Sequence, residues 1–154
     1  MALYLVQHGL SLPKDVDPEK GLSNEGMEAV QRIAEVARGY GIPVSRIIHS
    51  GKKRARQTAD ILATVLSPDK GVGKNTGINP LDDVTAFASQ VDFTANIMVV
   101  GHLPFLERLT SFLITGEQEP VVFKLQNGGI LCLDRFDNLA QPAIRWALMP
   151  QVNV

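Results

Sequence analysis

Short apolar runs alternate along this chain with longer stretches in which apolar residues recur at helical spacing. The runs predict buried strands and the longer stretches predict amphipathic helices. Strands are expected over residues 2–6, 44–50 and 97–100. Helices are expected from a cap at Ser23 to Gly39, over 53–66, weakly over 82–90, and over 105–114 after Pro104.

The last third of the chain has a different pattern. Two strand-like stretches, 121–125 and 129–135, flank Asn127-Gly128-Gly129, which predicts a hairpin between them, and 143–149 reads as an edge strand. The stretches 10–22 and 67–79 are polar and contain Gly and Pro, which predicts loops. Alternating strands and helices predict one domain over residues 1–154, a three-layer α/β/α sandwich with a mostly parallel sheet.

Three of the predicted strands end in polar clusters. These clusters hold every histidine of the chain: Gln7-His8-Gly9, His49-Ser50-Gly51 and Gly101-His102. Open α/β sheets bind ligands beyond the carboxyl ends of their strands, so these clusters mark a candidate site. For any single histidine, a hydrogen-bonded structural role is the simpler interpretation. For the three together, a shared site is favoured.

A basic cluster, Lys52-Lys53-Arg54-Ala55-Arg56, opens the helix predicted over 53–66. Positive charge at a helix N-terminus opposes the helix dipole, so the cluster is easier to explain if an anion binds there. Arg54 and Thr58 share one face of this helix, which would let guanidinium and hydroxyl point the same way. Lys52, Lys53 and Arg56 are instead interpreted as a solvated face.

Composition narrows the possible functions. The chain has 154 residues, 45% hydrophobic and 20% charged, with a formal net charge of −1. That near-neutral charge argues against nucleic-acid or membrane-surface partners, which require a broad positive field. A single cysteine, Cys132, excludes an internal disulfide, and neither a signal peptide nor a membrane-spanning run is evident. We therefore expect a cytoplasmic protein.

Two apparent motifs do not support a cofactor or a metal. Residues 71–75 resemble part of a phosphate-binding P-loop, but Pro68 stands at a required glycine and Asn75 at a required Ser or Thr. This segment is interpreted as a mobile loop. The three histidines lack a metal-binding His-x-x-x-His spacing and a cysteine pair. No metal and no cofactor are expected, and His49 is interpreted as structural or as a residue that supports the site without contacting a ligand.

Four segments in order along the chain resemble the histidine phosphatase superfamily, the phosphoglycerate-mutase-like enzymes. Gln7-His8-Gly9 resembles its Arg-His-Gly motif, and Leu22-Ser23-Asn24-Glu25-Gly26 resembles its Leu-Thr/Ser-x-x-Gly motif. Ser50-Gly51-Lys52-Lys53-Arg54-Ala55-Arg56-Gln57-Thr58-Ala59 is similar to Ser-x-x-x-Arg-Ala-x-Gln-Thr-Ala, and Gly101-His102-Leu103-Pro104 is similar to Gly-His-x-Pro. The short length resembles the compact phosphohistidine phosphatases of the SixA type.

This resemblance implies a phosphoglycerate mutase-like fold and a metal-independent phosphatase reaction. His8 would attack phosphorus and become a phosphohistidine, while Arg54 and His102 would hold the phosphoryl oxygens. Gln7 and Ser11 are further candidate phosphate-binding residues. Asp82 occupies the place of the acid that the family uses on the leaving group, with adjacent Asp83 not separable from it. A helix N-cap is an equally good interpretation of Asp82.

The chain departs from the family at Gln7, where an arginine is expected, and Leu10 stands where many members have an acid. Glutamine keeps an amide donor but loses the charge and the two-pronged contact of arginine. The leading interpretation is a phosphatase acting on phosphohistidine in a phosphorylated protein. The alternatives are a phosphate- or phosphohistidine-binding module that has lost turnover, and a phosphatase of small phosphorylated molecules.

Overall fold

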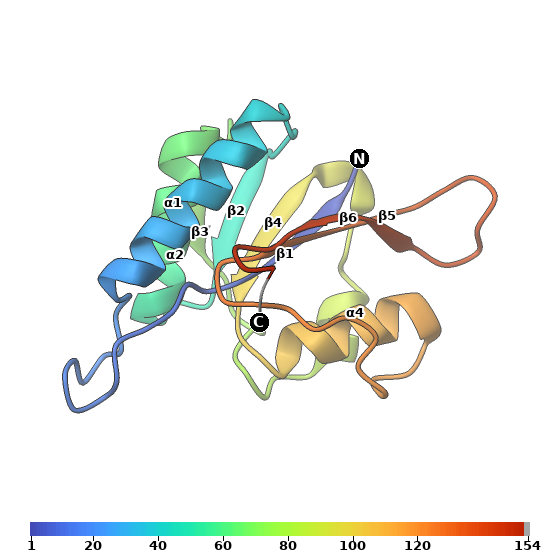
Figure 1. Ribbon diagram of the computed structural model, residues 1–154. Helices are drawn as coiled ribbons and strands as arrows, with labels where there is room; N and C mark the ends of the chain where they lie inside the picture. Colours follow the sequence, from blue (N-terminus) through green and yellow to red (C-terminus); the bar gives the residue numbers. More distant parts are fainter. Residues whose placement is uncertain (153–154) are drawn as a thin grey trace.

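The computed structural model describes residues 1–152, which form a six-stranded sheet in the order β3-β2-β4-β1-β5-β6 (Figure 1). Strands β1, β2, β3 and β4 are parallel to one another, whereas β5 and β6 run antiparallel at one end. The strands span Leu3–Gln7 (β1), Arg46–His49 (β2), Val72–Lys74 (β3), Ile97–Gly101 (β4), Ile130–Asp134 (β5) and Ala143–Leu148 (β6).

Helices cover both faces of the sheet, as Figure 1 shows. The helices are α1 (Asn24–Gly39), α2 (Lys53–Leu66), α3 (Val84–Ala88), α4 (Phe105–Thr115) and the 3-10 turn Phe93–Ala95. Helices α1 and α2 pack on one face, and α3 and α4 on the other, each with its own buried apolar cluster. The predicted three-layer sandwich with a mostly parallel sheet is confirmed.

Local sequence explains the first two helices. The Ser23 hydroxyl accepts the Gly26 N–H at 3.0 Å, so Ser23 is the N-cap of α1 that the sequence predicts. Helix α2 has the predicted bounds because buried Ala55, Ala59 and Leu62 keep a helical period. Its N-cap, Lys52, makes no side-chain capping bond within the described residues, which leaves the helix N-terminus available to an external acceptor.

Two predictions for irregular regions are wrong. Val72–Lys74, predicted as part of a mobile loop, is the short edge strand β3, which pairs with β2 through backbone hydrogen bonds that do not depend on side-chain pattern. Residues 121–125 are not a strand, so no hairpin joins them to 129–135. β5 instead pairs with β1 and β6. The expected edge strand at 143–149 is confirmed as β6.

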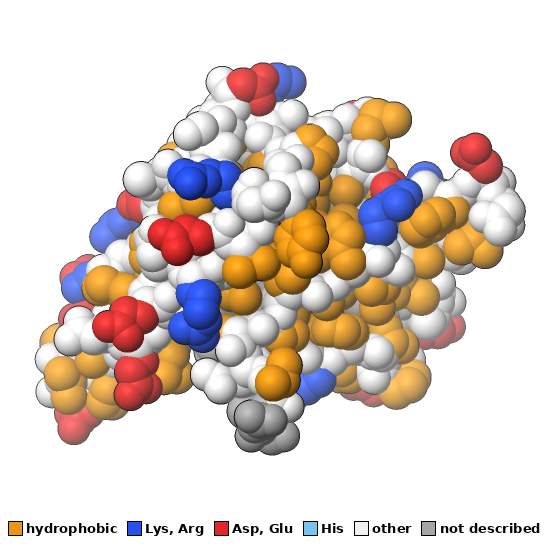
Figure 2. Space-filling model, turned by 45° about the horizontal axis from the view of Figure 1, so that its top comes forward, with side chains coloured by type: hydrophobic (Ala, Val, Ile, Leu, Met, Phe, Trp, Pro, Cys, Tyr) orange, Lys and Arg blue, Asp and Glu red, His pale blue; other side chains and the backbone are white. Residues whose placement is uncertain are grey.

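One face of the molecule, seen in Figure 2, carries lysine, arginine, aspartate and glutamate side chains intermixed on its left side and hydrophobic side chains toward its middle. An apolar groove lined by Tyr40, Ile42, Pro43 and Trp146 lies between the end of α1 and β6. Over residues 1–152, no helix has the length and apolar character needed to cross a bilayer.

Candidate active site

The sheet order brings two histidines together at the carboxyl ends of its strands. Because β1 and β4 are adjacent and parallel, with Gln7 paired to Gly101, the residues that follow them are neighbours. The His8 and His102 rings lie 5.1 Å apart between centroids, and the His8 backbone N–H donates to the Gly101 carbonyl at 3.0 Å. Ser50, which follows β2 on the other side of β4, reaches His102 at 2.6 Å.

The His8 ring is oriented by its own backbone neighbour. Its Nδ1 lies 2.7 Å from the Gly9 carbonyl oxygen, which can only accept a hydrogen bond. Nδ1 therefore carries the proton in the neutral ring, and the lone pair is on Nε2. This tautomer is the one required for Nε2 to act as a nucleophile.

The backbone around His8 is held from two directions. On one side the Gly9 N–H donates to Thr58 Oγ1 at 2.9 Å. On the other, the Gly128 N–H donates to the Gln7 carbonyl at 2.8 Å, and Asn127 Nδ2 donates to the His8 carbonyl at 3.0 Å. The Thr58 hydroxyl, expected to point with the Arg54 guanidinium, instead binds backbone: it accepts from Gly9 and donates to the Arg54 carbonyl at 2.8 Å.

Both site histidines are held neutral. Burial lowers the pKa of His8 to about 4 against the opposing effect of the hydrogen bond to Gly9, and the charges of Arg54 and Lys20 lower it further. Burial lowers the pKa of His102 to about 3, aided by His8, Arg54, Lys52 and Lys20. A cation-rich site that keeps its histidines uncharged is suited to receive an anion and to supply a neutral nucleophile.

This electrostatic setting gives a pH prediction. In an NMR titration of the ring protons, His8 and His102 should show no midpoint near the ordinary value of 6.5 and should begin to protonate only well below pH 6. Because their folded-state pKa values are depressed, their neutral forms contribute stability above pH 6.5 that is lost as the pH falls toward 4. A midpoint between 6 and 7 for either ring would contradict this.

Three lysines near the start of α2 have different roles. Lys53 pairs with Asp17 at 2.9 Å and lies 3.9 Å from Glu19, so its charge is already balanced. Lys52 and Lys20 act on the His102 ring, and Lys20 also acts on His8. Sequence reasoning missed Lys20 because it lies in the loop before α1. Its backbone φ of 53° is unusual for a residue other than glycine. This conformation cannot be predicted from the sequence around Lys20.

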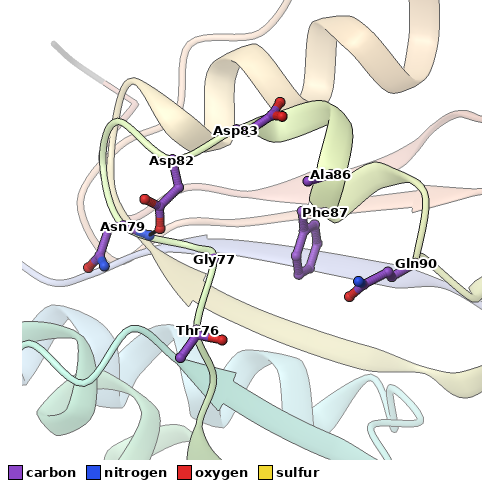
Figure 3. Close-up of a pocket in the computed structure, with 8 residues that line it drawn as sticks. All are labelled: Thr76, Gly77, Asn79, Asp82, Asp83, Ala86, Phe87 and Gln90. Atoms are coloured by element: carbon purple, nitrogen blue, oxygen red, sulfur yellow. Dashed lines mark hydrogen bonds between the residues drawn. The ribbon is translucent and has the colours of Figure 1, made fainter.

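The His8 and His102 rings lie together, and Arg54 is near enough to lower the pKa of both, whereas Asp82 lines a pocket whose lining includes none of these three residues. That pocket, about 500 Å³ in volume, is lined by Thr76, Gly77, Asn79, Asp82, Asp83, Ala86, Phe87 and Gln90 (Figure 3). The Asp82 carboxylate accepts the Asn79 N–H at 2.8 Å, while the Asp83 carboxylate points the other way. A role for Asp82 as an acid stays a prediction.

The alternative interpretation of Asp82, as a helix N-cap, is wrong by one residue. Asp83 caps α3, because its carboxylate accepts the Thr85 N–H at 2.9 Å. Ser11 and Gln7 are the two other residues that the sequence proposes for phosphate binding. Ser11 forms a backbone bridge with Leu22, and Gln7 has its side-chain Oε1 buried with no hydrogen-bond partner among residues 1–152. A phosphate-binding role for each stays a prediction.

His49, the third histidine at this edge of the sheet, makes a local hydrogen bond. The His49 Nδ1 accepts the Gly51 N–H at 3.0 Å, so this ring braces the turn after β2. Within residues 1–152, no three His, Cys, Asp or Glu side chains gather closely enough to hold a metal ion.

Gly26 is required where the loop after β1 crosses the start of α1. A Cβ at this position would collide with the backbone carbonyl of Leu10, which cannot move without shifting the segment that carries His8. We expect Gly26→Ala to destabilise the fold by about 1–3 kcal/mol, as overpacking does. Gly39→Ala in the same helix is the matched control, since its Cβ would meet no neighbour. Equal urea midpoints for the two variants would contradict the expected clash.

Comparison with known proteins agrees with this geometry. No family model matches the chain. The sequence is 23% identical to the phosphohistidine phosphatase SixA of Escherichia coli strain K12 over 127 residues, covering 79% of each chain. A structure of SixA complexed with tungstate superposes with a TM-score of 0.80 at 21% identity and covers 97% of each chain. A phosphoserine phosphatase from Entamoeba histolytica gives a TM-score of 0.68 at 17% identity over 95% of each chain.

These comparisons confirm the resemblance that the four sequence motifs predict. The motifs at His8, Gly26, Arg54 and His102 occupy the sheet edge and the two helix starts described above. The sequence match extends over most of both chains, and the fold matches over nearly all of this one. The chain is a homologue of the SixA phosphohistidine phosphatase and has the fold of the histidine phosphatase superfamily.

Proposed function

We propose that this protein is a metal-independent phosphatase that acts through a phosphohistidine on His8, with phosphohistidine in a protein as its substrate. One observation carries the proposal: a neutral His8 has its Nδ1 bound to Gly9 and, among residues 1–152, no hydrogen bond on Nε2, and it lies next to His102 and within the influence of Arg54. Homology to SixA supports phosphatase function for the chain.

The first step is an in-line displacement at phosphorus. The Nε2 lone pair of His8 forms the new P–N bond while the bond from phosphorus to the leaving group breaks. Arg54, at the start of α2, neutralises the phosphoryl oxygens together with the N–H groups of that helix end. The leaving group departs with the electron pair and takes a proton from solvent.

The second step releases phosphate. Water attacks phosphorus, the P–N bond to His8 breaks, and the electron pair returns to Nε2. The proton lost by water passes to solvent or to the departing phosphate, and His8 is restored in its neutral form. The His8 ring stays fixed between steps because its Nδ1–H remains bound to the Gly9 carbonyl.

The lack, among residues 1–152, of a nearby acid to protonate the leaving group favours a phosphoramidate substrate. No carboxylate is among the groups that act on the pKa of His8 or His102 within the described residues, and Asp82 is engaged with Asn79. An alkoxide leaving from a phosphate ester needs a positioned acid, whereas the imidazole of phosphohistidine can take its proton from solvent. Phosphohistidine should therefore react faster than a sugar phosphate.

The test is hydrolysis of a phosphohistidine-carrying protein by the purified enzyme with a metal chelator present, beside glucose 6-phosphate as an ester. We expect phosphohistidine turnover that the chelator does not affect, and at least about tenfold slower hydrolysis of the ester. Faster ester hydrolysis would favour a small-molecule phosphatase. Loss of turnover on chelation would contradict metal independence.

A second candidate, a binding module without turnover, rests on Gln7. Its amide supplies no charge where the family has an arginine, and its Oε1 is buried without a partner among residues 1–152. Since a charge-assisted hydrogen bond contributes about 1.5–3 kcal/mol, we expect Gln7→Arg to raise kcat/KM by about 10- to 150-fold. Gln31→Arg, which adds the same charge on the exposed face of α1, should change nothing.

Steady-state kinetics of the two variants decide between the candidates. A wild-type protein that binds inorganic phosphate but gains turnover only with Gln7→Arg would be the binding module. An unchanged kcat/KM in Gln7→Arg would contradict the expected gain and would mean that the existing cations, Arg54 and Lys20 among them, already provide enough positive charge.

A further inference from the structure

His102 is held by a hydrogen bond on one edge of its ring and, among residues 1–152, has no hydrogen-bond partner on the other. Its Nε2 lies 2.6 Å from the Ser50 hydroxyl oxygen, and both side chains are buried, at 2% and 6% exposure. Its Nδ1 is also buried, with no hydrogen-bond partner among residues 1–152. Buried polar atoms are nearly always paired, so an unpaired Nδ1 inside a candidate phosphate site calls for a ligand atom as its partner.

The proton inventory of Ser50 indicates which nitrogen of His102 is protonated. A serine hydroxyl has one proton to donate and lone pairs with which to accept. The Ser50 oxygen already receives the Lys52 backbone N–H at 3.4 Å, and within the described residues the hydroxyl proton has no acceptor other than His102. A hydroxyl that donates to Nε2 leaves the single proton of a neutral ring on Nδ1.

We propose that Ser50 is a positioning residue that holds His102 as the Nδ1–H tautomer, so that Nδ1–H donates a hydrogen bond to a phosphoryl oxygen. In the opposite tautomer Nε2–H would donate to Ser50, and Nδ1 would present a lone pair to an anion. That arrangement repels the phosphoryl group and leaves the Ser50 proton without an acceptor. The role in turnover rests on the proposed function, but the tautomer does not.

The geometry also explains why the serine stands at this place in the fold. Ser50 is the first residue after β2, and His102 is the first after β4, the strand paired with β2. The same parallel pairing that aligns the two strands therefore brings hydroxyl and imidazole to hydrogen-bonding distance. Since the Ser50 hydroxyl is engaged by His102 Nε2 and by the Lys52 backbone N–H, we expect it to act on the phosphate site through His102.

The first test reads the tautomer directly, without turnover. Long-range proton–nitrogen NMR of the labelled protein distinguishes Nδ1–H from Nε2–H, and a His102→Gln variant assigns the signals. We expect the Nδ1–H form in the wild type, with this proton shifting on addition of inorganic phosphate. In Ser50→Ala the ring should lose that fixed form. A wild-type ring in the Nε2–H form would overturn the inference whatever the enzyme's activity.

The second test follows kinetics with matched variants. We expect Ser50→Ala to lower kcat/KM by about tenfold or more, and Ser50→Thr, which keeps the hydroxyl, to recover most of the loss. Ser111→Ala is the control, because Ser111 is also buried but donates to the Pro120 carbonyl at 2.8 Å. A folded Ser50→Ala protein with wild-type kcat/KM and an unchanged tautomer would also overturn the inference.

The two tests separate this inference from the proposed function. If the wild type hydrolyses no phosphohistidine yet shows a Ser50-dependent Nδ1–H that responds to phosphate, the positioning role stands and the phosphatase proposal fails. If the wild type turns over and its ring is in the Nε2–H form, the phosphatase proposal stands and the role of Ser50 fails.

Discussion

His8→Ala should abolish phosphohistidine hydrolysis, with kcat falling by at least about a thousandfold. Removal of the nucleophile leaves only direct attack by water, which neither Arg54 nor His102 can replace. The half-buried ring donates from Nδ1 to the Gly9 carbonyl and contacts the His102 ring, so alanine removes a catalytic group while the backbone clamps at Gly9 and Gln7 remain. Initial rates with and without the substitution measure the effect.

A matched control for this variant is His49→Asn. His49 also ends a strand of the same sheet edge, but its Nδ1 only accepts the Gly51 N–H, and an asparagine oxygen can accept the same bond. We expect its kcat to stay within about threefold of the wild type. A His8→Ala protein that keeps its fold and more than a tenth of wild-type kcat would contradict the assignment of His8 as nucleophile.

Arg54→Ala should have the second largest effect, a loss of about 100- to 1,000-fold in kcat/KM. Arg54 is the second residue of α2, whose N-terminus has no side-chain cap, and its charge acts on both site histidines, so alanine would remove the fixed charge that we expect to bind the phosphoryl group. Arg54→Lys keeps the charge but loses the two-pronged geometry, and it should recover only part of the rate.

Arg56→Ala provides the comparison, because Arg56 is exposed on the same helix. The two alanine variants remove the same charge from the same helix, one inside the site and one outside it. We expect the Arg56 variant to keep nearly full kcat/KM, with a weaker salt dependence at most. Equal losses in the two variants would indicate a general electrostatic effect and would contradict a direct role for Arg54.

The sequence predicted the parts of the fold in which side-chain pattern determines structure. Helix α2 has its predicted bounds because its apolar period runs unbroken from Lys53 to Leu66. Strand β3 was missed because it contains Gly73, follows Gly71 and has exposed Val72 and Lys74, so its pairing with β2 rests on the backbone alone. A strand that a neighbouring strand organises leaves little trace in its own residues.

The turn at Asn127-Gly128-Gly129 shows how a local signal can be correct while its context is not. Gly128 has the positive φ of 80° that such a turn requires, but the stretch before it, 121–125, has no strand partner in the described chain. The turn instead donates hydrogen bonds to the Gln7 and His8 carbonyls, which hold the backbone at His8. Contacts between residues so distant in sequence follow from the fold and not from local composition.

The candidate site divides in the same way. His8, Arg54 and His102 could be predicted because each lies in a motif at the end of a strand or the start of a helix. The contacts of Ser50 and Lys20 could not be predicted. The pairing of β2 with β4 brings Ser50 to His102, and the path of the loop before α1 brings Lys20 near His8. Helix capping by Asp83, in place of Asp82, depends on a one-residue difference in where the α3 backbone turns.

The most direct test of the proposed phosphoryl transfer is rapid-quench mass spectrometry of the enzyme during turnover of a phosphohistidine-carrying protein. The quench must be alkaline, because phosphohistidine is labile in acid. The predicted result is a transient phosphoryl group on His8 that appears before free phosphate, decays as phosphate is released, and is absent from His8→Ala. A phosphoryl group on another residue, or phosphorylation that persists in His8→Ala, would contradict the account.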